Sequence, residues 1–362
     1  MKYISTINHD LQGISKLLLF NNHSNFSSVA VYSIFRDSCV MLYEIVKVLK
    51  KDGILREEVP NFEIIESIRH KVKSNQGRDN REIFNNILTT HFNLFGEDID
   101  NLGFYLEEGR TSGSTIYITY IFDNTPLFNS IDTGQVIKEF STEIGRMIAQ
   151  VMKSIQQPLV LTSKNIIADV YESGYELKDI WHKKLFTEDI TFNVCLMRLL
   201  IIQNEISSCL WLEKHLDYKT AEYTLDKYLL LRLSSIKFYQ TMENLIDIKE
   251  RVPQHYSSLG LNCLDSILLY YKNELRDEIK TLRDMLHYSN HQINFFEYVT
   301  DNLVKDNMYV DNILQILLID FFPKIKESIS NSLNISSIRS MNDWEKIIRR
   351  IDTKIKSRNN PK

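Results

Sequence analysis

Apolar residues recur at steps of three and four positions throughout the second half of the chain, which is the spacing of one helical face. Gly260 is the one glycine after Gly174, and no proline stands between Pro158 and Pro253. Since a sheet needs such residues at most of its turns, we expect this half to be nearly all helix. The expected helices cover residues 187–215, 217–251, 259–288, 293–322 (ended by Pro323) and 342–356. Four of them have 25 or more residues and short connections, which predicts an antiparallel bundle.

The first half of the chain has a mixed pattern. Helical spacing and end signals predict helices over residues 25–51, after Pro60, over 79–96 and over 132–155. Two short runs rich in β-branched and aromatic residues, 103–106 and 115–122, flank the stretch EEGRTSGS. This pattern predicts a β-hairpin over about 103–122 with a loose turn.

Together these elements predict a mainly α protein with two parts. Residues 1–157 are expected to form an α+β region with one β-hairpin, and residues 158–180 a linker. Residues 181–362 are expected to form the antiparallel helical bundle, including a basic C-terminal helix.

The composition is that of an ordinary globular chain of 362 residues, with 43% hydrophobic and 25% charged residues. A net charge of −4 excludes the global basic field of a dedicated nucleic-acid binder. No uninterrupted apolar stretch is long enough to cross a bilayer, and the N-terminus lacks the apolar region of a signal peptide. We therefore expect a cytoplasmic protein without a membrane partner.

The four cysteines, Cys39, Cys195, Cys209 and Cys263, contain no C-x-x-C pair. In a reducing compartment they are expected to behave as small buried apolar residues. The glycine-rich dinucleotide motif G-x-G-x-x-G is absent as well. No cofactor is expected.

The densest chemistry lies in residues 274–291. Arg283, Asp284, His287 and His291 are spaced so that each histidine has a partner three or four residues before it, which predicts one crowded helical face. A histidine there can transfer protons at a phosphodiester. Arg283 can hold the phosphate and stabilise its extra negative charge, and Asp284 can orient Arg283 or His287.

This segment resembles the HEPN superfamily, whose signature is an arginine, a polar residue and then a histidine. Arg283-Asp284 matches the opening, and Tyr288 follows the first histidine. Three residues separate Arg283 from His287 and seven separate it from His291, and the family's usual window lies between these spacings. The resemblance implies a helical, homodimeric, metal-independent RNase or nucleotide-binding module of a bacterial defence or toxin system. Arg283 would bind the scissile phosphate and His287 would be the acid/base.

Two other interpretations fit the same residues. Arg283 and Asp284 can be a solvated ion pair on a non-catalytic helical interaction protein, such as an immunity protein, an antitoxin or a regulatory scaffold. Alternatively, Asp284, His287 and His291 have a spacing that can chelate zinc or iron. No glutamate follows His287 as in the zinc motif H-E-x-x-H, and no E-x-x-H motif stands on another helix as in di-iron bundles. No metal is therefore expected.

The C-terminal residues 346–362 are strongly basic, with seven lysines and arginines against Asp352 alone. Arg349, Arg350, Lys354 and Lys356 are candidate contacts to an RNA backbone or to an acidic protein partner. A solvated helix end explains the same charges.

Overall fold

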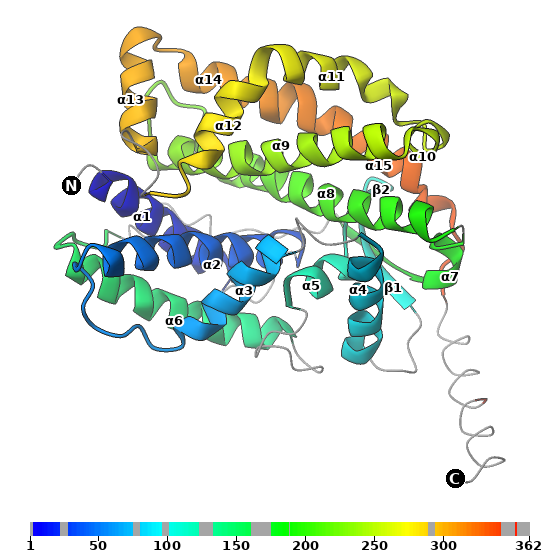
Figure 1. Cartoon of the computed structure of the whole chain (residues 1–362), viewed down its shortest axis with the longest axis horizontal. Coiled ribbons are helices and arrows are strands. Elements are labelled where there is room, and N and C mark those ends of the chain that lie inside the picture. The colour runs from blue at the N-terminus through cyan, green and yellow to red at the C-terminus, as the bar shows by residue number, and fades with distance from the viewer. Residues whose placement is uncertain are drawn as a thin grey trace.

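The computed structural model describes residues 3–21, 28–74, 80–95, 101–122, 133–160, 175–187, 189–288, 294–341 and 352. The chain is mainly helical, with a small sheet in its first half (Figure 1). In the first half the elements are α1 Ile4–Asn21, α2 Ser28–Lys51, α3 Phe62–Ser74, α4 Asn80–Phe95, β1 Asn101–Glu107, β2 Arg110–Ser114, α5 Thr115–Phe122, α6 Thr133–Ser154 and β3 Tyr175–Trp181. In the second half they are α7 His182–Leu185, α8 Ile190–His215, α9 Leu225–Arg251, α10 Pro253–Ser258, η2 Leu261–Leu264, α11 Asp265–Tyr270, η3 Tyr271–Leu275, α12 Arg276–Asp284, α13 Phe295–Lys305, α14 Tyr309–Leu314, η4 Gln315–Phe321, α15 Phe322–Leu333 and η5 Ile335–Ser337.

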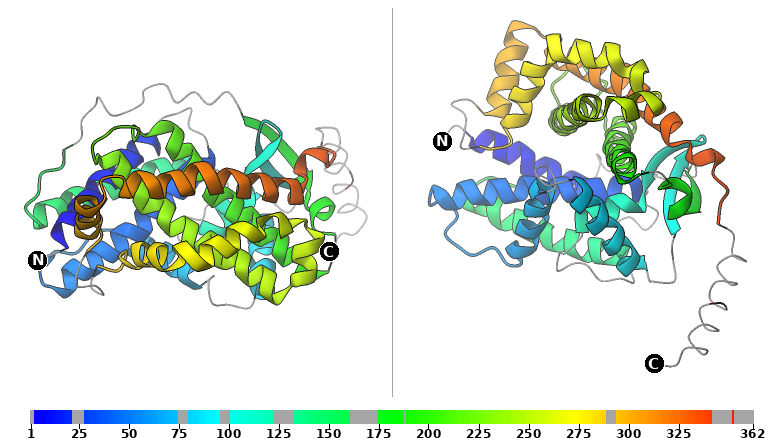
Figure 2. Two further views of the ribbon diagram at one scale, coloured as in Figure 1. Left: turned by 90° about the horizontal axis from the view of Figure 1, so that it is seen from above. Right: turned by 45° about the vertical axis from the view of Figure 1, so that its right-hand side comes forward.

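Helices α8 and α9 pack together in the middle of the molecule. Helices α1 and α2 lie against one side of this pair, and α11, α12, α14 and α15 lie against the other (Figure 2). Helix α13 contacts α1 and α14. Both central helices begin at a side-chain cap: Asp189 accepts from the backbone of Thr191 and Phe192, and Thr224 accepts from Lys227. The expected long helix 187–215 is thereby confirmed as α8, which begins at Ile190. The expected helix 217–251 is present only from Leu225 onwards, because residues 217–224 are not helical and Thr224 is the cap.

Helix α8 is long and apolar enough, by length and composition, to span a membrane. Most of it is buried inside this chain: 83% of its most apolar window is covered by other elements. The core helix of a soluble protein meets the same criterion, so α8 on its own is weak evidence for a membrane span.

The sheet of the described chain has three antiparallel strands in the order β2-β1-β3. The expected hairpin is present, but its second strand is Arg110–Ser114, the stretch expected as the turn. The expectation of a strand over 115–122 was wrong, because these residues form α5. Both edges of β1 are already paired, and Ile116 to Phe122 are all buried. The β-branched residues therefore pack as a core helix.

Strand β3 occupies residues 175–180 of the range that was expected to be a linker, and it continues to Trp181. It pairs with β1 from Asn101↔Trp181 to Glu107↔Tyr175. Residues 161–174 lie outside the described residues, so the domain boundary stays a prediction.

Helix α1 was not among the expected helices. Its pattern is irregular because polar Asp10 and small Gly13 occupy buried positions. A Cβ at Gly13 would lie 2.1 Å from Cδ2 of Leu229, so this glycine lets α1 approach α9 closely.

The expected single helix over 293–322 is interrupted in the structure. Helix α13 ends at Lys305, and a new helical stretch starts at Tyr309. Pro323 does not end that stretch, because it stands in the first turn of α15, directly after the π-helical segment η4. The wider hydrogen-bond register of a π segment lets the chain continue past a residue without an N–H.

Three of the cysteines are buried as expected, whereas Cys263 is exposed. Its Sγ lies 3.0 Å from Oγ of Ser328. The expectation of burial fails there because Cys263 belongs to the short segment η2, whose buried residues are Leu261 and Leu264.

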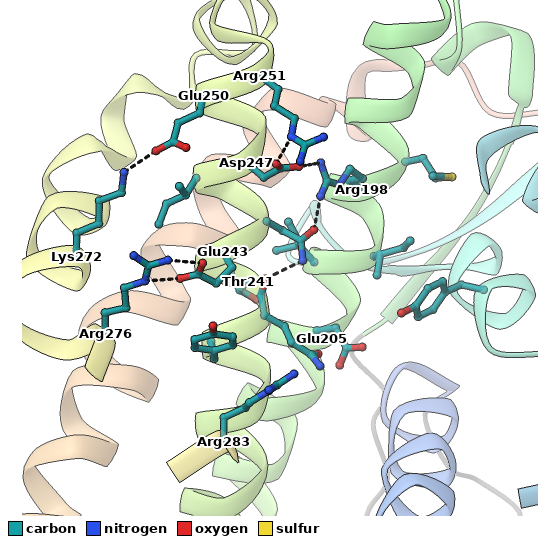
Figure 3. Close-up of a pocket in the computed structure, with 18 residues that line it drawn as sticks. Arg198, Glu205, Thr241, Glu243, Asp247, Glu250, Arg251, Lys272, Arg276 and Arg283 are labelled. Carbon is teal, nitrogen blue, oxygen red and sulfur yellow. Dashed lines mark hydrogen bonds and ion pairs between the residues drawn. The ribbon is translucent and has the colours of Figure 1, made fainter. Parts of the chain in front are cut away.

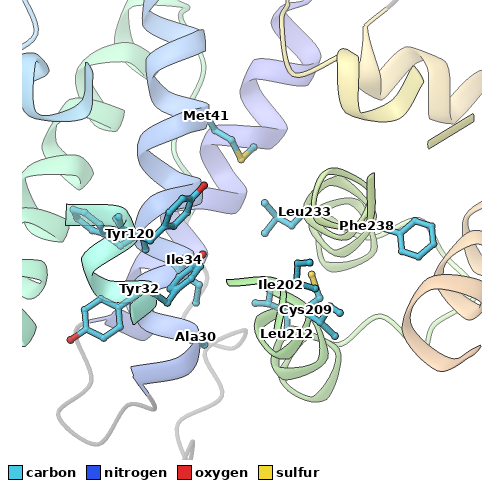
Figure 4. Close-up of a cluster of buried hydrophobic side chains, with 14 of the residues drawn as sticks. Ala30, Tyr32, Ile34, Met41, Tyr120, Ile202, Cys209, Leu212, Leu233 and Phe238 are labelled. Carbon is cyan, nitrogen blue, oxygen red and sulfur yellow. The ribbon is translucent and has the colours of Figure 1, made fainter. Parts of the chain in front are cut away.

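The buried apolar side chains of both halves form one continuous core. Figure 4 shows Met41 of α2 and Tyr120 of α5 facing Ile202 of α8 and Leu233 of α9. The core therefore crosses the expected boundary between the two parts.

A buried charge network lies in the same interface. Arg36 of α2 contacts Asp37 and Glu205, and Lys237 Nζ of α9 lies 2.8 Å from Asp37 Oδ2. Tyr117 Oη donates to Glu205 Oε1 at 2.7 Å. Since buried charges require partners, these contacts tie α2 and α5 to α8 and α9 in one arrangement.

Glu107, at the end of β1, links the sheet to two helices and makes a pH-dependent contribution. Burial by itself raises its pKa, but hydrogen bonds from Lys214 of α8 and Lys326 of α15 outweigh this and lower the pKa to about 2. Its stabilising contribution is complete above the unfolded-state pKa near 4.5 and is lost as the pH falls towards about 2.

We expect Glu107→Gln to flatten the fall in unfolding free energy over this window, measured by urea titration at pH 6 and pH 3. The exposed Glu176→Gln in β3 is the control, and equal pH dependence in both variants would contradict this role.

Candidate functional site

The predicted cluster around Arg283 lies where α12 ends. Helix α12 stops at Asp284, and a turn follows in which the backbone N–H groups of Leu286 and His287 donate to the carbonyls of Arg283 and Asp284. The expected single helical face therefore does not extend to His287. His291 lies outside the described residues.

A fully buried polar cluster fixes this turn. The Oη atoms of Tyr288 and Tyr228 donate to Asp10 of α1 at 2.5 and 2.7 Å. Arg232 Nη2 donates to the same carboxylate at 3.1 Å and to the carbonyl of Met285 at 3.2 Å. Burial raises the pKa of the Tyr288 phenol well above its usual value, so it stays a donor. The tyrosine of the predicted motif is thus an anchor of the turn.

His287 is held by a carboxylate from another helix. Its Nδ1 lies 3.1 Å from Oε2 of Glu44 in α2, and Arg69 Nε of α3 donates to Oε1 of Glu44 at 2.9 Å. The Glu44 side chain is 7% exposed and that of His287 is 31% exposed. Burial favours the neutral acid, but the His287 hydrogen bond and the Arg69 charge outweigh it and lower the pKa of Glu44.

This pairing determines which nitrogen of His287 is available. An ionised carboxylate can only accept, so Nδ1 of His287 carries the proton that faces Glu44. Within the described part of the chain, Nε2 has no hydrogen-bond partner. A carboxylate that orients an imidazole in this way leaves Nε2 as the atom for proton transfer.

Sequence reasoning missed Glu44 and did not give Arg69 a role. One signal was present: Glu44 follows Arg36 and Asp37 on a helix whose other buried residues are mainly apolar. A charged residue in such a stripe needs a partner from another element. The identity of that partner, 243 positions away, is visible only in the fold.

Arg283 lies in different surroundings from His287. Its Nη1 donates to Asp284 Oδ1 at 2.7 Å, and its guanidinium lies 5.3 Å from the ring centroid of Tyr239. Its side chain lines a cavity of about 530 Å³ between α8, α9 and the η3–α12 helix, and His287 does not (Figure 3). The arginine that the structure brings to His287, through their shared carboxylate, is Arg69.

The walls of this large cavity are charged on all sides. Arg276 makes two hydrogen bonds to Glu243, at 2.9 and 2.8 Å, and Lys272 Nζ lies 2.7 Å from Glu250. Lys272 belongs to the π-helical segment Tyr271–Leu275. Such segments occur often at functional sites. The cavity therefore suits a polar ligand better than an apolar one.

Within the described ranges, no group of three or more histidine, cysteine, aspartate or glutamate side chains could hold a metal ion. The alternative set of Asp284, His287 and His291 includes one residue outside those ranges. The candidate RNA contacts Arg349, Arg350, Lys354 and Lys356 also lie outside them, so their role stays a prediction.

Comparisons of this chain with protein families, with curated proteins and with solved structures found no match. The resemblance stated above therefore rests on the residues of the 283–288 segment and on the helical architecture.

Proposed function

We propose that this chain is a metal-independent endoribonuclease of the HEPN type that acts in a bacterial defence or toxin system. It would work in the cytoplasm as a homodimer with RNA as its substrate. His287 is the proton-transfer residue, Glu44 is its positioning residue and Arg283 contacts the phosphate. Within the described part of the chain, Nη1 is the one donor of Arg283 with a hydrogen-bond partner, so its other N–H groups are available to a phosphate.

The contact between His287 and Glu44 carries this proposal. In the proposed reaction, Nε2 of His287 takes the proton of a ribose 2′-hydroxyl. The 2′-oxygen then bonds to the adjacent phosphorus, and the bond from phosphorus to the 5′-oxygen breaks. The imidazolium returns its proton to the leaving oxygen. Ionised Glu44 stabilises the positive charge that His287 carries between these steps.

A second candidate function is favoured by the position of Arg283. Its side chain faces the α8–α9 cavity, whereas His287 contacts α2. Two residues that act on one phosphate should converge on it. Their separate surroundings favour a non-catalytic helical interaction protein, such as an immunity protein, an antitoxin or a regulatory scaffold.

Glu44→Gln tests the proposed function. We expect purified protein to cleave single-stranded RNA in EDTA, and Glu44→Gln to lower the rate at least about tenfold, because an amide does not stabilise the imidazolium. Glu66→Gln is the matched control, since Glu66 is an exposed carboxylate 3.4 Å from His70 on the neighbouring helix α3. A wild-type rate for Glu44→Gln, or loss of activity in EDTA, would contradict the mechanism. Absence of any cleavage by the wild-type protein would favour the scaffold.

A further inference from the structure

A pair of parallel aromatic rings lies beside the contact between His287 and Glu44. Tyr43 of α2 and Phe62, the first residue of α3, have ring centroids 5.7 Å apart and ring planes at 5° to each other. Both residues are partly exposed. Tyr43 directly precedes Glu44, and Arg69 connects the two, because it is ion-paired with Glu44 and its guanidinium lies 5.9 Å from the ring centroid of Tyr43. This ring pair therefore adjoins the residues that hold His287.

Two lysines of α2 lie over these rings. Lys47 Nζ is 5.9 Å from the ring centroid of Tyr43, and Lys50 Nζ is 5.2 Å from that of Phe62. Tyr43, Lys47 and Lys50 follow one another at steps of four and three residues, so they lie on one face of α2. Both lysines are exposed, and within the described part of the chain neither has an ion-pair partner. Two cations beside the ring pair are thus available to an anion.

The carboxylates near Tyr43 have other partners. Burial is the larger cause that raises the pKa of its phenol, and the nearby charges of Glu66 and Glu44 raise it further. Glu44 is held by Arg69, and the carboxylate of Glu66 lies 3.4 Å from Nε2 of His70. Neither carboxylate therefore neutralises a lysine of α2.

Partly exposed rings flanked by cations match the chemistry of single-stranded nucleic acid. An unpaired base of any identity can stack on an aromatic ring, and lysines bind the phosphates on either side of it. A base inside a duplex is already stacked between its neighbours, so it is not free to stack on a side chain. A lysine stem is flexible, so its ammonium group can turn from the ring to a phosphate when a base arrives.

We propose that Tyr43 and Phe62 form a stacking site for an unpaired base of single-stranded RNA, and that Lys47 and Lys50 bind the phosphates that flank this base. The inference rests on the proposed function, because His287 defines the bond beside which the base lies. It restricts the substrate to RNA that is single-stranded at the point of cleavage. Base identity matters little there, because stacking accepts every base.

Binding of an RNA analogue that cannot be cleaved tests the stacking site. The probe is a labelled single strand of about eight 2′-O-methyladenosines, and its fluorescence anisotropy gives the dissociation constant. We expect Tyr43→Leu, which keeps an apolar side chain against Phe62 but removes the ring, to weaken binding about tenfold. Tyr43→Phe keeps the ring and should bind like the wild type. The corresponding duplex should bind at least about tenfold more weakly than the single strand.

The salt dependence of the same binding tests the lysines. Lys47→Gln and Lys50→Gln should each reduce the slope of log binding constant against log salt concentration by about 0.7, because each removes one phosphate contact. Lys324→Gln is the matched control and should keep the wild-type slope. Lys324 is an exposed lysine of α15, which packs against α8 on the side away from α2 (Figure 2).

Three results would overturn the stacking site: wild-type binding by Tyr43→Leu, equal weakening in Tyr43→Phe, or an unchanged salt slope in both lysine variants. The exposed lysines keep the test valid even if Tyr43→Leu fails to fold. Binding of an oligoglutamate peptide in place of the oligonucleotide, weakened by Tyr43→Leu, would overturn RNA as the ligand.

The stacking site and the proposed nuclease can fail separately. If the wild type binds the probe through Tyr43 but does not cleave RNA, the nuclease is contradicted and the stacking site is supported. If the wild type cleaves RNA and Tyr43→Leu binds the probe equally well, the stacking site is contradicted and the nuclease is not.

Discussion

Replacing His287 with alanine should lower RNA cleavage by about 10²- to 10⁴-fold, the usual cost of losing a general acid/base. The free energy of unfolding should change by less than about 1 kcal/mol, because His287 is partly exposed and Glu44 keeps its contacts with Arg69. The rate of cleavage and urea unfolding, measured on the same preparations, check both parts.

His70→Ala is the control for His287→Ala, since His70 also pairs with a carboxylate but is largely exposed on α3. Added imidazole should restore part of the lost activity, which a purely structural effect would not allow. Arg283→Ala should also abolish cleavage, whereas His291→Ala should have the smaller effect. If His287→Ala cleaves RNA at the wild-type rate, the assignment of His287 is wrong.

Replacing Asp10 with alanine should destabilise the protein by about 3–5 kcal/mol. The change leaves the guanidinium of Arg232 buried without its carboxylate, and it removes the acceptor of Tyr228 and Tyr288. Asp10 and Arg232 are both 0% exposed, so water cannot replace the lost partner. Urea unfolding followed by circular dichroism gives the free energy directly.

The double variant Asp10→Leu/Arg232→Met is the control for this cluster. Removing both charges avoids an uncompensated ion, so the double variant should be less destabilised than the sum of its two single replacements. Additive costs, or a cost below about 1 kcal/mol for Asp10→Ala, would contradict the importance of the ion pair.

The helices were predictable where apolar spacing and end signals agree. Asp189 and Thr224 cap α8 and α9, and both helices pack their apolar residues into one core. The apolar pattern gave a wrong prediction, a strand, for residues 116–122, because all of these residues are buried. A fully buried segment has no polar face, so its apolar residues do not show whether the repeat is that of a helix or of a strand. Strand β3 was missed because its pairing with β1 joins segments far apart in the chain.

The chemistry of the site was predictable only in part. The sequence contains Arg283 and His287 at a suggestive spacing, but the end of α12 at Asp284 separates their surroundings. Glu44 and Arg69 come from helices far from His287 in the chain, so no local spacing could associate them. In the sequence, Tyr288 was only the residue that follows His287 and had no predicted role. Its hydrogen bond to the buried Asp10 gives it a structural role.

The buried Asp10 also has a consequence for how the protein is made. Its partners Arg232 and Tyr288 come 222 and 278 residues later in the chain. A ribosome adding about 5–20 residues per second needs on the order of ten seconds to a minute to deliver them. During that time the nascent N-terminal helix has no counter-charge to bury against, so it must stay hydrated or be held by a chaperone. Translation that stops before residue 232 should therefore release a fragment that aggregates or is degraded.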